Sequence, residues 1–296
     1  MCRQQPTFDD QVDAQVERLR TKSLRVIEDE VAAKRNAWWD RQPAETRGAG
    51  TASPTPRDAF ETLFFRYMGL KPCDIPVLRE TDSEIVWSSR NPCPTLEACK
   101  TTGLDTRDVC RGAYEKSTQA LLSRIDPQLR FLRDYAQIRP YSAHCLEKIV
   151  RISFKQRMRL AIDEARLSRR QGNKGYGAVA VLGDRIVSQA HDTAVTDKDP
   201  SQHAEMKALR QAVHVLGDAN LSGVVLFSTC EPCPMCASMA VWSNISAIVF
   251  GASINDTVAR GRSRITVSAQ QILNNSPVRI ELYPGILRSE CLDLYV

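Results

Sequence analysis

The chain has 296 residues, of which 43% are hydrophobic and 25% are charged, and its formal net charge is +5. These values are ordinary for a soluble globular protein, and the length predicts about two domains. No apolar run is long enough to cross a bilayer, and the polar N-terminus does not resemble a signal peptide. The charge excess is smaller than a dedicated nucleic-acid binder needs. The ten cysteines are scattered along a long chain, which favours reduced thiols in the cytoplasm.

The first 151 residues predict three consecutive segments. Residues 1–42 are expected to form an N-terminal helical segment, and residues 9–42 have the periodicity of one long polar helix. This helix could serve for docking, for dimerisation or for packing on the next domain. Residues 43–57 have no large apolar side chain, which predicts a flexible linker. Residues 58–151 mix helical and strand patterns, as in an α+β domain of unknown role. No site is predicted there, because its cysteines lack metal-site spacing and free cysteine is usually buried: Cys73, Cys93, Cys99, Cys110 and Cys145.

Residues 152–296 alternate between strand and helix patterns, which predicts an α/β domain. An amphipathic helix opens the domain and a short helix from residue 286 closes it. The intervening strands are predicted at 177–182, 185–190, 224–228, 247–251 and 278–282, and the intervening helices at 203–216 and 234–242.

Two short runs in this domain have the residue types of a metal site. His203 stands two residues before Glu205, and the run Pro232-Cys233-Pro234-Met235-Cys236 follows. One imidazole and two thiolates make a three-ligand zinc site with its fourth position open for water, whereas a structural zinc needs a fourth Cys or His nearby. Zinc makes that water more acidic, and Glu205 is placed to take its proton and pass it to a leaving amine.

This pattern resembles the zinc-dependent nucleobase deaminases, which combine H-x-E with P-C-x-x-C. The longer run from Ser228 to Cys236 resembles the guanine deaminase and tRNA adenosine deaminase branch of the cytidine-deaminase-like superfamily. The resemblance covers residues 153–291. It implies a three-layer α/β fold with helices on both faces of a mixed sheet. It also implies a Zn²⁺ cofactor, a hydrolase that acts on C–N bonds of cyclic amidines, and a homodimer.

Three further residues are expected to contact the substrate. Asp192 stands where the family usually has an asparagine, and Trp242 stands where the guanine deaminase branch also has tryptophan. The backbone around Ala204 is expected to help hold the ring. Trp242 and the acidic and apolar tail after Arg288 favour a small purine-type amino-heterocycle, such as guanine or a nucleoside. The alternatives are adenosine in tRNA, and a regulatory or scaffold protein whose N-terminal domain binds a ligand.

Overall fold

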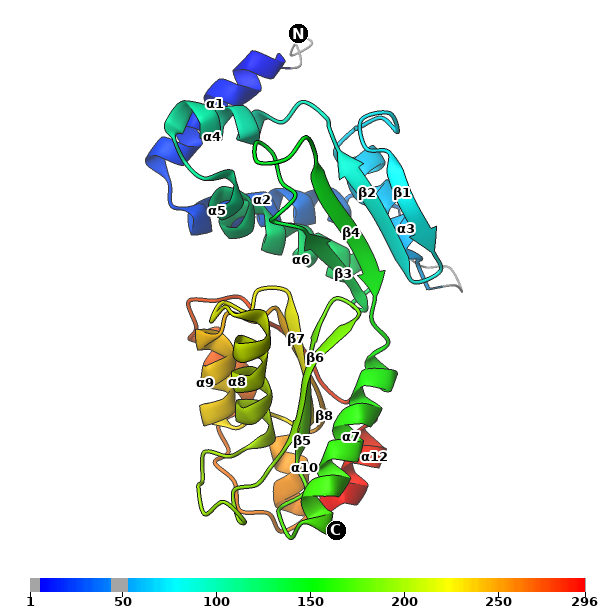
Figure 1. The fold of residues 1–296 in the computed structure, drawn as a ribbon, viewed down its shortest axis with the longest axis vertical. Coiled ribbons are helices and arrows are strands. Elements are labelled where there is room, and N and C mark those ends of the chain that lie inside the picture. Colours follow the sequence, from blue (N-terminus) through cyan, green and yellow to red (C-terminus); the bar gives the residue numbers. More distant parts are fainter. Residues whose placement is uncertain (1–5, 44–52, 296) are drawn as a thin grey trace. The chain divides into compact units, whose positions relative to one another are not determined.

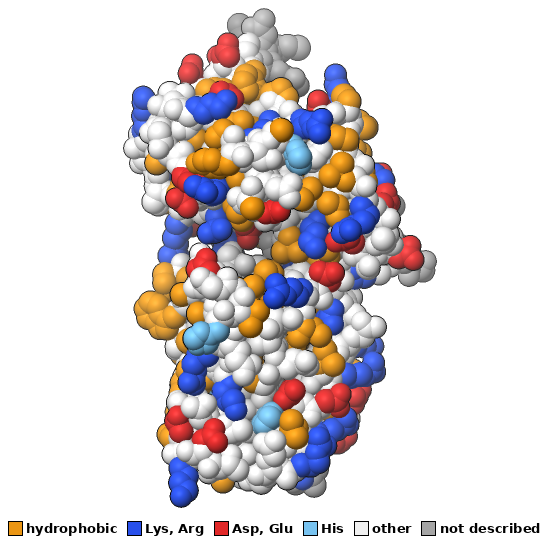
Figure 2. Space-filling model, in the orientation of Figure 1, with side chains coloured by type: hydrophobic (Ala, Val, Ile, Leu, Met, Phe, Trp, Pro, Cys, Tyr) orange, Lys and Arg blue, Asp and Glu red, His pale blue; other side chains and the backbone are white. Residues whose placement is uncertain are grey.

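The protein is represented by a computed structural model that describes residues 6–43 and 53–295. The chain divides into two compact units, Met1–Arg151 and Ile152–Val296 (Figure 1). Across the described ranges, none of the helices is long and apolar enough to cross a membrane. Basic and acidic side chains are interspersed over the visible face of each unit (Figure 2).

The first unit is built on a four-stranded antiparallel sheet with the order β1-β2-β4-β3. Its strands are β1 (Val77–Thr81), β2 (Glu84–Ser89), β3 (Leu129–Arg133) and β4 (Cys145–Arg151). The alternating sequence patterns at residues 84–88 and 129–132 predict β2 and β3, whereas no pattern predicts β1 and β4. Central β4 pairs with both neighbours, so Ile149 lies opposite Ile85 on one side and Phe131 on the other. The last strand of this unit therefore runs to the residue at which the second unit begins.

Two helices replace the single N-terminal helix predicted over 9–42. Helix α1 ends at Thr21, the backbone of Lys22 is extended, and the Ser23 hydroxyl accepts a hydrogen bond from Val26 N to cap a new helix. The prediction was wrong because the apolar spacing continues across this cap. The helical elements of the unit are α1 (Phe8–Thr21), α2 (Leu24–Asp40), α3 (Pro56–Phe60), α4 (Pro94–Thr102), α5 (Thr106–Cys110), α6 (Lys116–Ile125) and the π-helical η1 (Glu61–Tyr67) and η2 (Arg111–Glu115).

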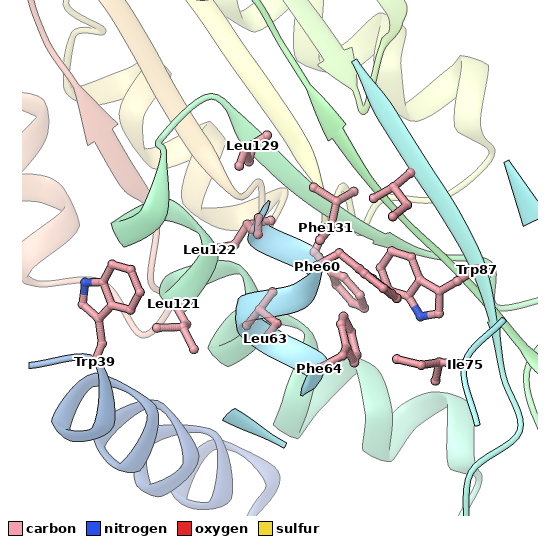
Figure 3. Packing of buried hydrophobic residues seen from close by; sticks show 13 residues of the cluster. Trp39, Phe60, Leu63, Phe64, Ile75, Trp87, Leu121, Leu122, Leu129 and Phe131 are labelled. Atoms are coloured by element: carbon pink, nitrogen blue, oxygen red, sulfur yellow. The ribbon is translucent and has the colours of Figure 1, made fainter. Parts of the chain in front are cut away.

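The N-terminal helices belong to the same compact unit as the sheet. Helix α1 packs on α4, and α2 packs on α6 and η2. Most of the predicted linker, residues 44–52, lies outside the described residues, and α3 begins at Pro56 within its last part. The core lies between the helices and the sheet, where Trp87 contacts Phe60, Phe64 and Phe131 (Figure 3).

The second unit contains a mixed five-stranded sheet with the order β6-β5-β7-β8-β9. The hairpin β5–β6 and the pair β5–β7 are antiparallel, whereas β7–β8 and β8–β9 are parallel. The predicted mixed sheet is thereby confirmed. The strands are β5 (Gly177–Leu182), β6 (Arg185–His191), β7 (Val224–Cys230), β8 (Ala247–Ala252) and β9 (Glu281–Tyr283).

Helices cover both faces of this sheet, as predicted. Helices α8 (Ala204–Leu216) and α9 (Pro234–Trp242) lie on one face, and α7 (Phe154–Arg170) and α12 (Arg288–Leu292) lie on the other (Figure 1). Between β8 and β9, where the sequence patterns predict no element, the chain forms α10 (Ile254–Ala259) and α11 (Ala269–Asn274), and the 3₁₀ helix η3 (Asp293–Tyr295) follows α12. The sheet and these two layers position the site at the carboxyl end of β7.

Candidate active site

His203, Cys233 and Cys236 lie at the N-terminal ends of the two helices on one face of the sheet. His203 is the N-cap residue of α8, Cys233 is the N-cap residue of α9, and Cys236 lies in the first turn of α9. Strand β7 ends at Cys230, so the chain passes directly from the sheet into the cysteine-bearing helix. A helix N-terminus favours negative charge, which suits two thiolate ligands.

The three side chains have the spacing that tetrahedral zinc requires. His203 Nδ1 lies 3.5 Å from each sulfur, and the two sulfurs are 3.6 Å apart. Zinc–sulfur and zinc–nitrogen bonds of ordinary length at a tetrahedral angle predict about 3.6 Å between nitrogen and sulfur and about 3.8 Å between sulfurs. Among the residues that the structure describes, this is the one group of three or more such side chains close enough to share a metal ion. The donor set therefore fits a zinc ion.

The Cys233 thiol is the more acidic of the two in this arrangement. The hydrogen bond with Cys236, followed by the contact with His203, lowers the pKa of Cys233 to about 4. A thiol with a pKa that low is a thiolate at neutral pH, which is the form that binds metal. The Cys236 side chain is fully buried, so this part of the site is closed to bulk solvent.

Glu205 lies beside the three metal-ligand candidates without belonging to them. It is buried on the first turn of α8, and its Oε2 lies 3.7 Å from Cys236 Sγ. The Ser228 hydroxyl on β7 donates a hydrogen bond to Glu205 Oε1 at 3.1 Å. Burial raises the pKa of the Glu205 carboxyl. One oxygen is thus held by the sheet while the other points toward the metal-ligand candidates. The motif did not indicate this role for Ser228, because the contact joins positions 23 residues apart.

Asp192 follows directly after β6 and is fully buried. Its backbone carbonyl accepts a hydrogen bond from the Ser168 hydroxyl, and its Oδ1 accepts one from Ala194 N at 3.4 Å. Its Oδ2 is buried without a hydrogen-bond partner among the described residues. The hydrogen bond with Cys233 is the main cause that raises the pKa of His203, and the negative charge of Asp192 adds to it. Asp192 therefore keeps one buried oxygen without a donor among the described residues, and substrate contact stays a prediction.

The other two expected substrate contacts lie in different places. Ala204 is buried in the first turn of α8, next to the metal-ligand candidate His203. Trp242 is the last residue of α9, at the opposite end of the helix from Cys233, and it is 80% exposed. A helix of nine residues is about 13 Å long. The structure therefore does not bring Trp242 to this site within one chain.

A cavity of about 470 Å³ opens beside His203 and Cys233. Three of its lining residues are cationic, Lys174, Arg262 and Arg264, and its described lining contains no carboxylate. Arg264 reaches in from the segment between α10 and α11, lies over the Tyr176 ring and donates to the Glu231 carbonyl. The sequence patterns predict no element here, although the three arginines at alternate positions, Arg260, Arg262 and Arg264, were a signal for a basic loop.

Glu231 lies between Cys230 and Cys233 and connects the site to the basic segment between α10 and α11 through hydrogen bonds. Its carboxylate is buried and accepts hydrogen bonds from Ile254 N and Ala269 N, each at 2.9 Å. These are the first residues of α10 and α11, so one carboxylate accepts a hydrogen bond from the start of each helix. The position of the arginines over the cavity therefore depends on the same motif that carries the cysteines.

A three-ligand metal site with a buried carboxylate, on the helix N-termini of a mixed α/β sheet, defines the class of zinc-dependent hydrolytic deaminases. Residues 152–252 match the family described as the cytidine and deoxycytidylate deaminase zinc-binding region. The chain belongs to this family.

The curated relatives include tRNA-specific adenosine deaminases and a guanine deaminase. The tRNA-specific adenosine deaminase of Bacillus subtilis (strain 168) is 34% identical over 134 residues, which are 45% of this chain and 81% of that protein. The enzyme of the same name from Aquifex aeolicus (strain VF5) is 37% identical over 140 residues, which are 46% and 89% of the two chains. The guanine deaminase of B. subtilis is 36% identical over 86 residues, which are 29% of this chain and 55% of that protein.

Solved structures of both kinds are similar as well. A structure from a study of tRNA:A34 deaminases has 27% identity and a TM-score of 0.42, and it covers 47% of this chain and 98% of its own. A guanine deaminase from Nitrosomonas europaea has 22% identity and a TM-score of 0.43, with 48% and 81% covered.

Proposed function

We propose that the protein hydrolytically removes the exocyclic amine of a purine-type nucleobase that carries phosphate, as adenosine in tRNA does, and releases ammonia. His203, Cys233 and Cys236 are the zinc ligands and Glu205 carries the proton. When bound, a zinc ion with three protein ligands lowers the pKa of water in its open fourth position. We choose a substrate with phosphate because the lining of the adjacent cavity is basic.

The protein side chains supply the proton transfer and the orientation. Glu205 takes a proton from the attacking water and delivers it to the amine, so that the carbon–nitrogen bond breaks as the carbon gains oxygen. Ser228 fixes the carboxylate through Oε1 and leaves Oε2 for this transfer. Asp192 Oδ2 lacks a donor, so a substrate hydroxyl or ring N–H that reached it would satisfy a buried oxygen.

The two sequence features that favour a free base lie away from the cavity. Trp242 is exposed at the distal end of α9. The acidic tail packs on α7, where Glu290 lies 3.9 Å from Arg159 and the Leu294 carbonyl accepts a hydrogen bond from Arg169. Neither feature contributes a residue to the cavity lining. Three cations there instead favour a substrate with phosphates beside the base.

Ammonia release tests the proposal on four substrates: free guanine, adenosine, adenosine monophosphate and a tRNA anticodon stem-loop. The stem-loop should have the highest kcat/KM, and that value should fall steeply as salt rises. Arg262→Ala should raise KM for the stem-loop and reduce the salt slope by about 1. Arg260→Ala is the matched control, because Arg260 is exposed and does not line the cavity.

A free guanine-type base is the second candidate, supported by the similarity to a guanine deaminase. It predicts the highest kcat/KM on guanine, little dependence on salt, and no difference between the two arginine variants. A protein without ammonia release on any substrate, despite full zinc content, would instead fit a regulatory or scaffold role.

Two further expectations accompany the proposed reaction. All nine cysteines among the described residues are free, which supports a reducing compartment such as the cytoplasm. The homodimer implied by the resemblance would give a second copy the opportunity to cover exposed Trp242. Sedimentation of the zinc-loaded protein tests that expectation.

A further inference from the structure

The first unit contains a cavity of its own, with a volume of about 470 Å³. Residues from α1, α2, η1, β3 and the stretch 89–96 line it. This volume is in the range of small-molecule binding sites, which are usually mostly apolar with a few well-placed polar groups. Nothing in the deaminase chemistry uses it, because every residue proposed for that reaction lies in the second unit.

Arg35 is a buried cation in this cavity, and none of the described residues supplies a counter-ion for it. Only 8% of it is exposed, and its Nη1 donates to the Ser117 and Thr118 hydroxyls at 2.8 and 2.7 Å. Among the described residues, no carboxylate oxygen lies within 4.0 Å of its guanidinium, and Nε is buried without a partner. Burial accordingly lowers the pKa of Arg35. Buried charges in proteins are normally paired, since an isolated one is costly.

Two further arginines in the lining also have unused donors. Arg133 pairs with Glu147 through Nε and Nη2, but its Nη1 is buried and has no hydrogen-bond partner in the described part of the chain. The same Glu147 carboxylate accepts hydrogen bonds from Trp87 Nε1 and Ser89 Oγ, so its negative charge is shared among three donors. Arg139 donates from Nη1 to the Asn91 carbonyl, and its buried Nε has no partner within residues 6–43 and 53–295.

The lining as a whole has an excess of positive charge. Five cations, Arg18, Lys34, Arg35, Arg133 and Arg139, face two carboxylates, Glu30 and Glu147. Glu30 is already paired with Arg18 and with Lys22, which lies outside the cavity. Beyond the effect of burial, Arg133 is near enough for its charge to lower the pKa of Arg35 further. An anion in the cavity would offset both the repulsion and the missing hydrogen bonds.

We propose that this cavity binds a small organic anion, a carboxylate or a phosphate monoester, through Arg35, Arg133 and Arg139. Guanidinium groups match both anions because their planar N–H groups can donate in pairs. The rest of the ligand is apolar and preferably aromatic, because Phe64, Tyr67, Tyr114 and Phe131 line the same space.

Two observations indicate binding rather than chemistry. The three thiols in the lining, Cys93, Cys110 and Cys145, do not form a metal-ligand group with other described residues. Burial raises the pKa of Cys93 and raises that of Cys110 to about 12, so these two thiols stay protonated at neutral pH. A protonated thiol is a poor nucleophile.

The backbone around the cavity is unusual in the same place. Tyr67 belongs to the π-helical η1 and Tyr114 to the π-helical η2, and both side chains line the cavity. Such segments are rare and are often found at functional sites. They supply part of the aromatic lining, whereas α2, β3 and the following loop supply the arginines.

Thermal unfolding and calorimetry of the full chain test the proposal with three probes: inorganic phosphate, phenyl phosphate and benzoate. Three of the four tryptophans, Trp38, Trp39 and Trp87, report on the first unit by fluorescence. Relative to sodium chloride at the same ionic strength, a probe at about 100 times its Kd should raise the Tm by about 5 °C or more. Phenyl phosphate should bind more tightly than inorganic phosphate because of the aromatic lining. Preference between phenyl phosphate and benzoate identifies which anion the site takes.

Arg35→Met and Arg139→Met should each remove most of this rise, because methionine keeps an apolar chain without the charge. Arg124→Met is the matched control, since Arg124 pairs with Asp40 at the surface and does not line the cavity. It should respond to the probes like the wild type. If none of the three probes raises the Tm of the wild type above the chloride baseline, the proposal is wrong. Equal rises in the wild type and both cavity variants would also overturn it. Arg139→Met keeps the test decisive if Arg35→Met fails to fold.

Discussion

Glu205 is held by a neutral hydroxyl on the neighbouring strand rather than by a cation. Ser228 donates to one carboxylate oxygen, and burial raises the pKa of the acid. An ion pair with a buried arginine would hold the carboxylate in its ionised form, whereas a hydroxyl permits it to gain and lose a proton. At the scale of residues, a carboxylate that is held in position by a neutral hydroxyl fits the proton transfer proposed for Glu205.

Glu205→Gln keeps the shape of the side chain and removes its ability to carry the proton. Zinc content should stay at about one per chain, while kcat falls by a factor of about 10² or more. Ser228→Ala should lower kcat less, by about tenfold, since the carboxylate remains but is less well oriented. Glu97→Gln, on the surface of the first unit, is the control. Activity that survives in Glu205→Gln would assign the proton transfer to another group.

Asp192→Ala tests whether the unpartnered Oδ2 receives a donor from the substrate. Loss of a hydrogen bond to a charged group should lower kcat/KM by about 10- to 100-fold with unchanged zinc content. Asp192→Asn should have a smaller effect, because the amide keeps an acceptor and adds a donor. Kinetics and Tm are both measured. A change in Tm with the same kcat/KM per folded molecule in both variants would leave Asp192 a structural residue.

At the scale of elements, helix α7 approaches β5 closely because Gly177 has no side chain. A Cβ at this position would lie 2.0 Å from the Ala161 carbonyl oxygen and 2.5 Å from Ala165 N. Both are backbone atoms of α7 that cannot move aside singly. Gly177 also donates its N–H to Thr229 Oγ1 on β7, one residue before the strand ends at Cys230. The helix, the hairpin and the site strand thus meet at one glycine.

Gly177→Ala should displace α7 and lower the free energy of unfolding by about 3 kcal/mol, at the upper end of the usual cost of overpacking. Gly172→Ala is the control. Its φ is +84° but the space around it is open, so it should cost only about 1 kcal/mol of backbone strain. Chemical denaturation measures both variants. Equal effects would mean that the helix can shift at little cost.

At the scale of the whole molecule, the two units have separate cores and separate sheets. Strand β4 ends at Arg151 and completes the first sheet, while α7 begins at Phe154 and covers the second. Each unit also has its own cavity. The deaminase unit, with about 145 residues from Ile152 onward, is within the size of domains that fold alone.

A truncated protein beginning at Ile152 should fold and bind about one zinc per chain. A start at Ile149 would be too early, because Ile149 and Val150 pair with β2 and β3 and belong to the first sheet. Circular dichroism and elemental analysis check the result, with the full chain as control. A soluble but metal-free product would show that the first unit supplies part of the zinc-binding fold.

The zinc motif was predictable from the sequence because its residues are close together in short elements. His203 and Glu205 share the start of one helix, and Cys233 and Cys236 share the start of another. Within each helix, the spacing of these residues determines which side chains lie on the same side of the helix start. The order of strands and helices from 153 onward was predictable for a similar reason, since local periodicity determines each element.

The charge of each cavity was decided only by tertiary structure. Arg262 and Arg264 reach the site because Glu231 holds the starts of α10 and α11. Arg35, Arg133 and Arg139 meet in the first unit although about 100 residues separate the first from the others. Strand β4 was not predictable because its side chains are only partly buried, so its sequence pattern resembles that of a loop. It is defined as a strand by its pairing with β2 and β3. Long-range packing determines which residues become neighbours, and the local sequence pattern does not predict these contacts.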